Sequence, residues 1–177
     1  MHTFLLTILC FILFLNVLLM LALVIGFFYK VPYVPSTKAQ IRKMIEAADI
    51  KAGEHIADLG CGDGKILFMA EKYSKGVSFT GYEIAPMPIL FFYMKKIFNR
   101  SKASLKTMDF MKEDYSKYSV IFLYLLPEAM DKLLPKFEKE LPKGARVISN
   151  VFTFKNKKPS MVIDADKKMH SVNLYTF

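Results

Sequence analysis

The sequence predicts an α/β fold in which a mostly parallel sheet carries helices on both faces and follows one long apolar helix. After residue 53, short apolar segments alternate with amphipathic segments of helical period, a pattern typical of a parallel sheet. A glycine-rich turn at 60–64 separates the first such strand from the next helix. Residues 4–28 contain no charged side chain. A chain of 177 residues then has room for one compact domain.

Residues 1–29 are expected to form a transmembrane anchor, since about 20 apolar residues suffice to cross a bilayer. A cleaved signal peptide would begin with basic residues and have a shorter apolar core, whereas this chain begins Met-His-Thr. Positive residues flank the end of the apolar segment at Lys30, Lys38, Arg42 and Lys43, and such residues stay on the cytoplasmic side. We therefore expect a single-pass membrane protein with its domain on the cytoplasmic (interior) side.

The positive charge lies entirely outside the apolar segment. Every Lys, Arg, Asp and Glu follows residue 29, so the formal net charge of +9 belongs to the rest of the chain. Near a bilayer, each well-placed Lys adds roughly 1 kcal/mol of attraction to anionic lipids. Nucleic acid is the second possible partner of a basic surface, and a merely solvated surface is the third interpretation. Because an anchor precedes the domain, we expect the charge to face anionic lipid and expect no nucleic acid.

Residues 30–52 form a pre-domain segment. The run Val31-Pro32-Tyr33-Val34-Pro35-Ser36 is held extended by its prolines. Thr37 is a candidate helix N-cap, and apolar residues then recur at helical spacing to about Asp49. A short amphipathic helix is therefore expected before the main domain, which we assign to 53–177.

The main domain alternates strands and helices. Strands are expected at 55–59, 77–82, 103–108, 120–125 and 146–152, and helices at 64–73, 86–98 and 127–141. Two further strands, at 160–163 and 171–175, surround a turn at 164–167 without an intervening helix. One member of this last hairpin must therefore run antiparallel.

The glycine spacing distinguishes between classes of nucleotide-binding turn. A dinucleotide fingerprint needs G-x-G-x-x-G, but the last position counted from Gly60 is Lys65. A phosphate-binding P-loop needs a hydroxyl after its lysine, where this chain has Ile66. The remaining pattern, D-x-G-x-G-x-G at residues 58–64, resembles motif I of the seven-strand S-adenosylmethionine-dependent methyltransferases. The alternative is a tight turn in which glycine serves only to permit positive φ.

This resemblance implies a Rossmann-like seven-strand methyltransferase sheet with S-adenosyl-L-methionine at the carboxyl ends of its strands. Asp58 would orient the loop and the amino-acid end of the cofactor, and Glu83 would accept hydrogen bonds from the ribose hydroxyls. Asp109 would accept from the adenine amino group while Phe110 covers the ring. The alternative for Glu83 is an ordinary exposed glutamate, and the alternative for Asp109 is a turn residue. The expected cofactor-binding residues of the domain are Asp58, Gly60, Cys61, Gly62, Gly64, Glu83, Ile84, Asp109 and Phe110.

The fourth strand ends in Tyr-Leu-Leu-Pro-Glu, at the place that faces the transferring methyl group in such folds. Tyr124, Pro127 and Glu128 are therefore substrate-side candidates. Pro127 is equally explained as the first residue of a helix and Glu128 as a favourable first-turn charge. Enzymes that methylate adenine or glutamine amides often carry Asn/Asp-Pro-Pro-aromatic here, and its absence argues against a nucleic-acid substrate.

The cysteines predict no disulfide, because Cys10 lies in the apolar segment and Cys61 in the glycine loop. Cys61 could be a nucleophile, but a small residue that fits a crowded turn explains it better. None of His2, His55 and His170 is well placed by sequence to act as a base, and we expect no metal ion.

The whole chain resembles a smaller family, the membrane-anchored lysine methyltransferases that in eukaryotes modify the ATP synthase c subunit and the adenine nucleotide translocase. The resemblance rests on the apolar segment, the run at 31–36, the glycine loop and the residues at 124–128. It implies that Tyr33, Pro35 and Ser36 help to cover the cofactor, although Tyr33 also suits an interfacial anchor. This chain departs from the animal members in its brevity and its basic C-terminal end.

The sequence therefore predicts a membrane-tethered, S-adenosylmethionine-dependent enzyme that N-methylates lysine of a membrane or membrane-associated protein. Two alternatives stay open. The enzyme could methylate a small molecule of the membrane, such as a quinone precursor or a lipid head group. The chain could also be a non-catalytic module that keeps the fold and binds cofactor or partner only.

Overall fold

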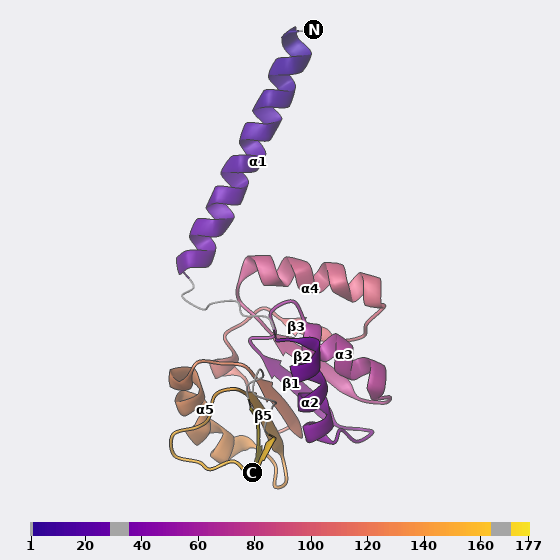
Figure 1. Ribbon diagram of the computed structural model, residues 1–177, viewed down its shortest axis with the longest axis vertical. Coiled ribbons are helices and arrows are strands. Elements are labelled where there is room, and N and C mark those ends of the chain that lie inside the picture. Colours follow the sequence, from indigo (N-terminus) through magenta and orange to yellow (C-terminus); the bar gives the residue numbers. More distant parts are fainter. Residues whose placement is uncertain (1, 29–35, 164–170) are drawn as a thin grey trace.

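The computed structural model describes residues 2–28, 36–163 and 171–177, and within the first helix it describes side chains for 4–21. Helix α1 (His2–Phe28) projects away from an α/β domain (Figure 1). Its segment Phe4–Leu21 has a mean hydropathy of 2.9 and is not buried anywhere against the domain. By length and composition, this helix could span a membrane.

The domain contains the alternating elements that the sequence predicts. Its helices are α2 (Lys38–Ala48), α3 (Lys65–Tyr73), α4 (Pro86–Asn99) and α5 (Pro127–Glu140), with a 3-10 turn at Phe110–Lys112. Its strands are β1 (His55–Leu59), β2 (Ser78–Tyr82), β3 (Ser104–Lys106), β4 (Val120–Leu123), β5 (Arg146–Asn150), β6 (Met161–Ile163) and β7 (Val172–Thr176). Helix α2 begins with the predicted cap, because Thr37 and Gln40 form a reciprocal capping box.

The strands form one sheet in the order β3-β2-β1-β4-β5-β7-β6. Strands β1 to β5 pair in parallel, and β7 runs antiparallel to both β5 and β6. This confirms the predicted seven-strand, mostly parallel sheet with an antiparallel last hairpin. The predicted turn of that hairpin, 164–167, lies outside the described residues. The chain order reverses between β1 and β4, and ligands of such sheets bind at this switch point.

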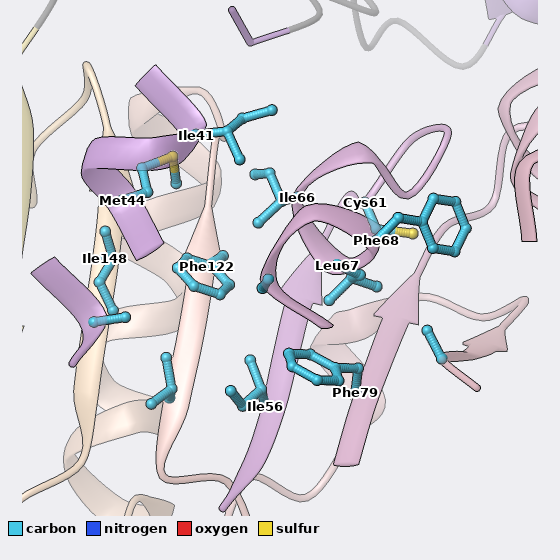
Figure 2. Close-up of a cluster of buried hydrophobic side chains, with 14 of the residues drawn as sticks. Ile41, Met44, Ile56, Cys61, Ile66, Leu67, Phe68, Phe79, Phe122 and Ile148 are labelled. Carbon is cyan, nitrogen blue, oxygen red and sulfur yellow. The ribbon is translucent and has the colours of Figure 1, made fainter. Parts of the chain in front are cut away.

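Alternate residues of the central strands supply two hydrophobic cores. On one face, Ile56, Phe122 and Ile148 pack with side chains of α2 and α3 (Figure 2). On the other face, the neighbouring strand residues pack with Phe137 and other side chains of α5. Because side chains alternate across a strand, a strand buried on both faces reads as a continuous apolar run. This explains why residues 120–123 contain only apolar side chains.

Three strands end earlier than the sequence suggests, and the first of them, β3, ends at Lys106 instead of residue 108. The hydrophobicity of 120–125 predicts a strand to Leu125, but β4 ends at Leu123 and the following residues turn into a cavity. Strand β5 ends at Asn150 instead of Phe152, because Val151 adopts a positive φ of 69°. The Ser149 hydroxyl donates to the Phe152 carbonyl at 2.7 Å and closes this bend. The segments that follow β4 and β5 therefore both turn toward the same end of the sheet.

Candidate functional site

A cavity of about 280 Å³ lies at the carboxyl ends of the parallel strands. One or two positions after each of β1, β2, β3, β4 and β5, a residue contributes to its wall. The wall consists of Ser36, Asp58, Gly60, Cys61, Gly62, Asp63, Lys65, Ile66, Tyr82, Glu83, Ile84, Ala85, Pro88, Met108, Asp109, Phe110, Tyr124, Leu125, Leu126, Ala129 and Phe152. Because parallel strands end at one edge of the sheet, residues far apart in sequence meet there.

Backbone hydrogen bonds hold the glycine loop against the neighbouring strand. The amides of Gly60 and Cys61 donate to the Tyr82 carbonyl at 2.9 and 3.0 Å. Gly60 has a φ of +71°, and a Cβ there would lie 3.1 Å from the Leu125 side chain. Glycine at this position therefore keeps the loop compact and leaves its backbone bare toward the cavity.

Gly64 serves helix packing and is not part of the cavity wall. A Cβ on Gly64 would lie 2.5 Å from the ring of Phe92 in α4 and 2.8 Å from Phe68 in α3. The φ of Gly64 is also positive, at +76°. The expected cofactor role of Gly64 thus reduces, in this geometry, to letting α4 approach the loop closely.

Glu83 links the second strand to the glycine loop. Its Oε2 accepts from the Gly62 amide at 3.0 Å, and its Oε1 accepts from the amides of Ile84 and Ala85, both at 2.8 Å. A carboxylate has about four acceptor positions, so Glu83 keeps capacity for a ligand in the cavity. Both Glu83 and Ile84 line the wall.

Asp58 is a buried carboxyl group with an unpaired oxygen. The residue is 2% exposed, and its Oδ2 has no hydrogen-bond partner among the described residues. Burial, followed by the nearby charges of Glu83 and Asp63, raises the pKa of Asp58 to about 8. An unpaired buried acceptor is costly, and a cationic or hydrogen-bond-donating ligand in the cavity would relieve that cost.

The turn after β3 contributes Asp109 and Phe110 to the cavity wall. The Asp109 Oδ1 accepts from the Met111 amide at 3.0 Å and caps the 3-10 turn. The Phe110 carbonyl accepts from the Tyr115 hydroxyl at 2.6 Å. Asp109 therefore acts as a turn residue, the alternative considered above. Its position in the cavity wall is also compatible with a hydrogen bond to adenine.

Ser36 is fastened to the cavity wall from two directions. Its carbonyl accepts from Lys65 Nζ at 2.7 Å, and its hydroxyl accepts from Asn150 Nδ2 at 3.1 Å. Ser36 is itself buried and lines the cavity. Of the three pre-domain residues expected to cover the cofactor, Ser36 therefore lines the cavity, while Tyr33 and Pro35 lie outside the described residues.

An aromatic pair lines the wall after β4 and β5. The rings of Tyr124 and Phe152 stack with centroids 6.1 Å apart and an interplanar angle of 28°. Pro127 and Glu128, the other substrate-side candidates, are the first residues of α5 and do not line the cavity. Their alternative roles at the helix start account for them in this structure.

Sequence reasoning missed several wall residues. Phe152 is the last residue of the strand expected at 146–152, and its place at the carboxyl end of that strand could have identified it. Asp63, which lines the cavity, forms an ion pair with Lys95 of α4. The residues of this pair are 32 positions apart, so no local pattern indicates their contact.

Cys61 packs into the sheet. A Cβ on Gly81 would lie 2.5 Å from the Cys61 sulfur, so this strand position has room only for glycine. Burial, followed by the charge of Asp58, raises the pKa of the thiol well above its usual range. A thiol with a raised pKa is a poor nucleophile, which favours the interpretation of Cys61 as a small residue in a crowded turn.

The chain has clear relatives among known proteins. Residues 58–161 match the family described as the ANTKMT methyltransferase domain. A protein-lysine N-methyltransferase of Saccharolobus islandicus is 34% identical over 149 residues, which cover 82% of this chain and 92% of that protein. The human lysine N-methyltransferase of the ATP synthase c subunit is 32% identical over 133 residues, which cover 74% of this chain but only 56% of the human protein.

A solved structure shares the architecture. The RNA methyltransferase of Salinibacter ruber, in complex with S-adenosyl-L-homocysteine, superposes with a TM-score of 0.75 at 28% identity. The alignment covers 81% of this chain and 93% of that protein.

Proposed function

This chain belongs to the ANTKMT methyltransferase family, and from that membership we propose that it methylates lysine in a protein lying in or against the membrane that holds α1. It is an S-adenosyl-L-methionine-dependent protein-lysine N-methyltransferase. The membrane part of the proposal is carried by Ser36, which follows the end of α1 by eight residues and forms part of the cavity wall. The tether and the active site are thus close together in the chain.

The cavity residues fit the cofactor. The unpaired oxygen of Asp58 and the carboxylate of Glu83 suit a ligand with an ammonium group, a sulfonium group and ribose hydroxyls. The bare backbone at Gly60 and Gly62 permits close approach, and Phe110 offers a ring face for adenine. When bound, the cofactor supplies an activated methyl group on its sulfonium. Cys61 and Ile84 complete the wall without a polar role.

In this proposal Tyr124 and Phe152 receive the substrate lysine. Their ring faces attract an ammonium group, and the apolar side chains beside them, such as Leu126, lower the pKa of an amine that enters. The amine must be neutral to present a lone pair. Methyl transfer then requires only that water is excluded and that the reacting atoms lie about 3–3.5 Å apart. No dedicated base is needed.

The tether accounts for the choice of substrate. A single membrane helix raises the effective concentration of partners in the same bilayer without any new contact. With the domain on the cytoplasmic (interior) side, the positive charge of the domain would be attracted to anionic lipids. A membrane protein whose lysine lies near the surface is therefore the substrate that we favour.

Radiolabelled cofactor and membranes from cells that lack this chain provide the test. Label is expected in material that resists lipid extraction and ribonuclease but is lost with protease. Label that moves into the organic phase would identify the rival substrate, a quinone precursor or lipid head group. Label that ribonuclease removes would assign the chain the activity named for its Salinibacter relative.

A paired substitution tests whether cofactor chemistry is the purpose of the chain. Glu83→Gln is expected to weaken binding of S-adenosyl-L-homocysteine in calorimetry and to reduce labelling in proportion. Glu138→Gln, at an exposed position of α5, is the control and should change neither. A cellular role that survives Glu83→Gln with binding lost would favour the non-catalytic module.

A further inference from the structure

Helix α4 exposes its apolar side chains. Ile97 is 76% exposed and Phe98 is 83% exposed. The other large apolar residues exposed along the helix are Met87, Leu90, Phe91, Tyr93 and Met94. They recur at spacings of three and four residues, so they share one face, and we call this set the α4 outer face. Contiguous apolar surface of this kind marks a site of interaction.

The polarity of α4 is the reverse of that of a soluble surface helix. Phe92 is fully buried beneath it and packs on Phe68 with ring centroids 5.0 Å apart. Lys95 and Lys96 are less exposed than the α4 outer face, and Lys95 pairs with Asp63. A surface helix in water turns its charges outward. The outward side of α4 is instead apolar, and water solvates such a surface poorly.

The arrangement of the two helices identifies what covers the face. Helix α1 contacts α4, and α4 lies crosswise to it on the side of the domain from which α1 projects (Figure 1). Ser36 follows Phe28 by only eight residues, a span of less than about 30 Å even when fully extended. If α1 spans a bilayer, the surface of that bilayer must lie within reach of α4.

We propose that the α4 outer face is a membrane-docking surface, with α4 lying in the head-group layer of the bilayer that α1 crosses. The inference rests on the membrane tether of the proposed function. Apolar and aromatic side chains at the interface with nearby cations are typical of such helices, and exposed Arg100 and Lys102 follow α4 directly. Tyr93 has the amphipathic ring that favours the interface.

Docking of α4 determines which lysines can reach the active site. Pro88 of α4 and Ile84, just before it, belong to the cavity wall. Phe92 packs directly on the glycine loop at Gly64, and Lys95 pairs with Asp63 of the same loop. A docked α4 therefore holds the cavity at the lipid surface. The preferred substrates are lysines at the depth of the head groups, and lysines far out in water are disfavoured.

The absence of tryptophan from this chain makes a direct test possible. Single substitutions Phe98→Trp and Phe91→Trp are introduced into the full chain, which is reconstituted in phosphatidylcholine vesicles brominated at a shallow or a deep acyl position. We expect the fluorescence of both to be quenched, more strongly by shallow bromine. Leu13→Trp in α1 should be quenched more strongly by deep bromine.

Tyr73→Trp is the matched control. Tyr73 is 65% exposed at the end of α3, and α3 runs from the cavity to the opposite end of the sheet. Its fluorescence should not be quenched at either depth.

The outcomes separate this inference from its premise. Quenching of Leu13→Trp without quenching of Phe98→Trp would overturn α4 docking and leave the tether intact. Loss of quenching at both positions would overturn the tether and the docking together. Blue-shifted but unquenched emission from Phe98→Trp would show that protein, such as a second copy of this chain, covers the face instead of lipid.

A functional measurement completes the test. The double substitution Ile97→Ser/Phe98→Ser should reduce methylation of a lysine peptide anchored in vesicles and leave methylation of the same peptide free in solution unchanged. Tyr73→Ser should change neither rate. Equal losses on both peptides would contradict the docking role.

Discussion

Replacing Asp58 with asparagine should change how the stability of this protein depends on pH. The carboxyl group is buried beside Glu83 and Asp63, which raises its pKa from 3.8 to about 8. In the unfolded chain the group ionises near 3.8, so between these values the folded state holds a proton that the unfolded state has released. The free energy of unfolding therefore falls as pH rises through this window. Below 3.8 and above 8 the group contributes no slope.

The size of the effect follows from the width of the window. Each pH unit within it costs about 1.4 kcal/mol, so the step from pH 5 to pH 7 lowers the stability of the wild type by up to ~2.7 kcal/mol through this group alone. For a chain of this size that equals a loss of roughly 5–11 °C in melting temperature. Asp58→Asn removes the titration and with it this part of the decline.

The assay uses circular dichroism to monitor thermal unfolding of the full chain in detergent micelles. The melting temperature is measured at several pH values. Asp114→Asn is the control: Asp114 is exposed, and hydrogen bonds from Ser116 lower its pKa. Its removal should leave the decline between pH 5 and 7 in place. Saturating S-adenosyl-L-homocysteine should flatten the decline in the wild type, since a bound ammonium group favours ionised Asp58. An equally steep decline in Asp58→Asn would refute this account of the buried carboxyl.

Three further outcomes are expected. Gly64→Ala should cost about 2–4 kcal/mol in denaturant unfolding, because it adds a clash with Phe92 to an unfavourable φ, whereas Gly144→Ala has open space and should cost only about 1 kcal/mol. Cys61→Ala should retain methyl transfer. In a Cys10→Ser background, Cys61 should be alkylated only after unfolding, because its thiol pKa is raised. Rapid alkylation of the folded chain would instead support a nucleophilic role for Cys61. Tyr124→Ala should lower kcat/KM for a lysine peptide about tenfold without changing cofactor affinity, and Tyr124→Phe should preserve both.

Much of the cavity wall could be predicted from sequence for one physical reason. In a parallel sheet, each residue that follows a strand reaches the same edge. Once 55–59 and 77–82 are recognised as strands, Asp58 and Glu83 must lie near each other, and the structure joins Glu83 to the loop through Gly62. Asp109 and Tyr124 reach the wall by the same reasoning. Spacing along the chain sufficed for these positions.

Properties that depend on distant partners could not be predicted. Ser36 is held by Asn150, 114 residues away, and this contact exists only because α2 packs against β5. Tyr124 meets Phe152 only because β4 and β5 are neighbours and Val151 bends the chain. Pro127 and Glu128 are substrate-side candidates by position, yet the start of α5 places them outside the cavity wall.

Sequence alone suffices to predict the class of fold, the glycine loop, the apolar first helix and the chemistry of the acidic residues at the ends of the strands. These features are local, and periodicity and spacing encode them directly. Three other properties depend on packing: which side of α4 faces outward, which carboxyl group is buried away from water, and which aromatic rings stack. Burial and contact are properties of the packed chain, since they depend on side chains that the sequence keeps far apart.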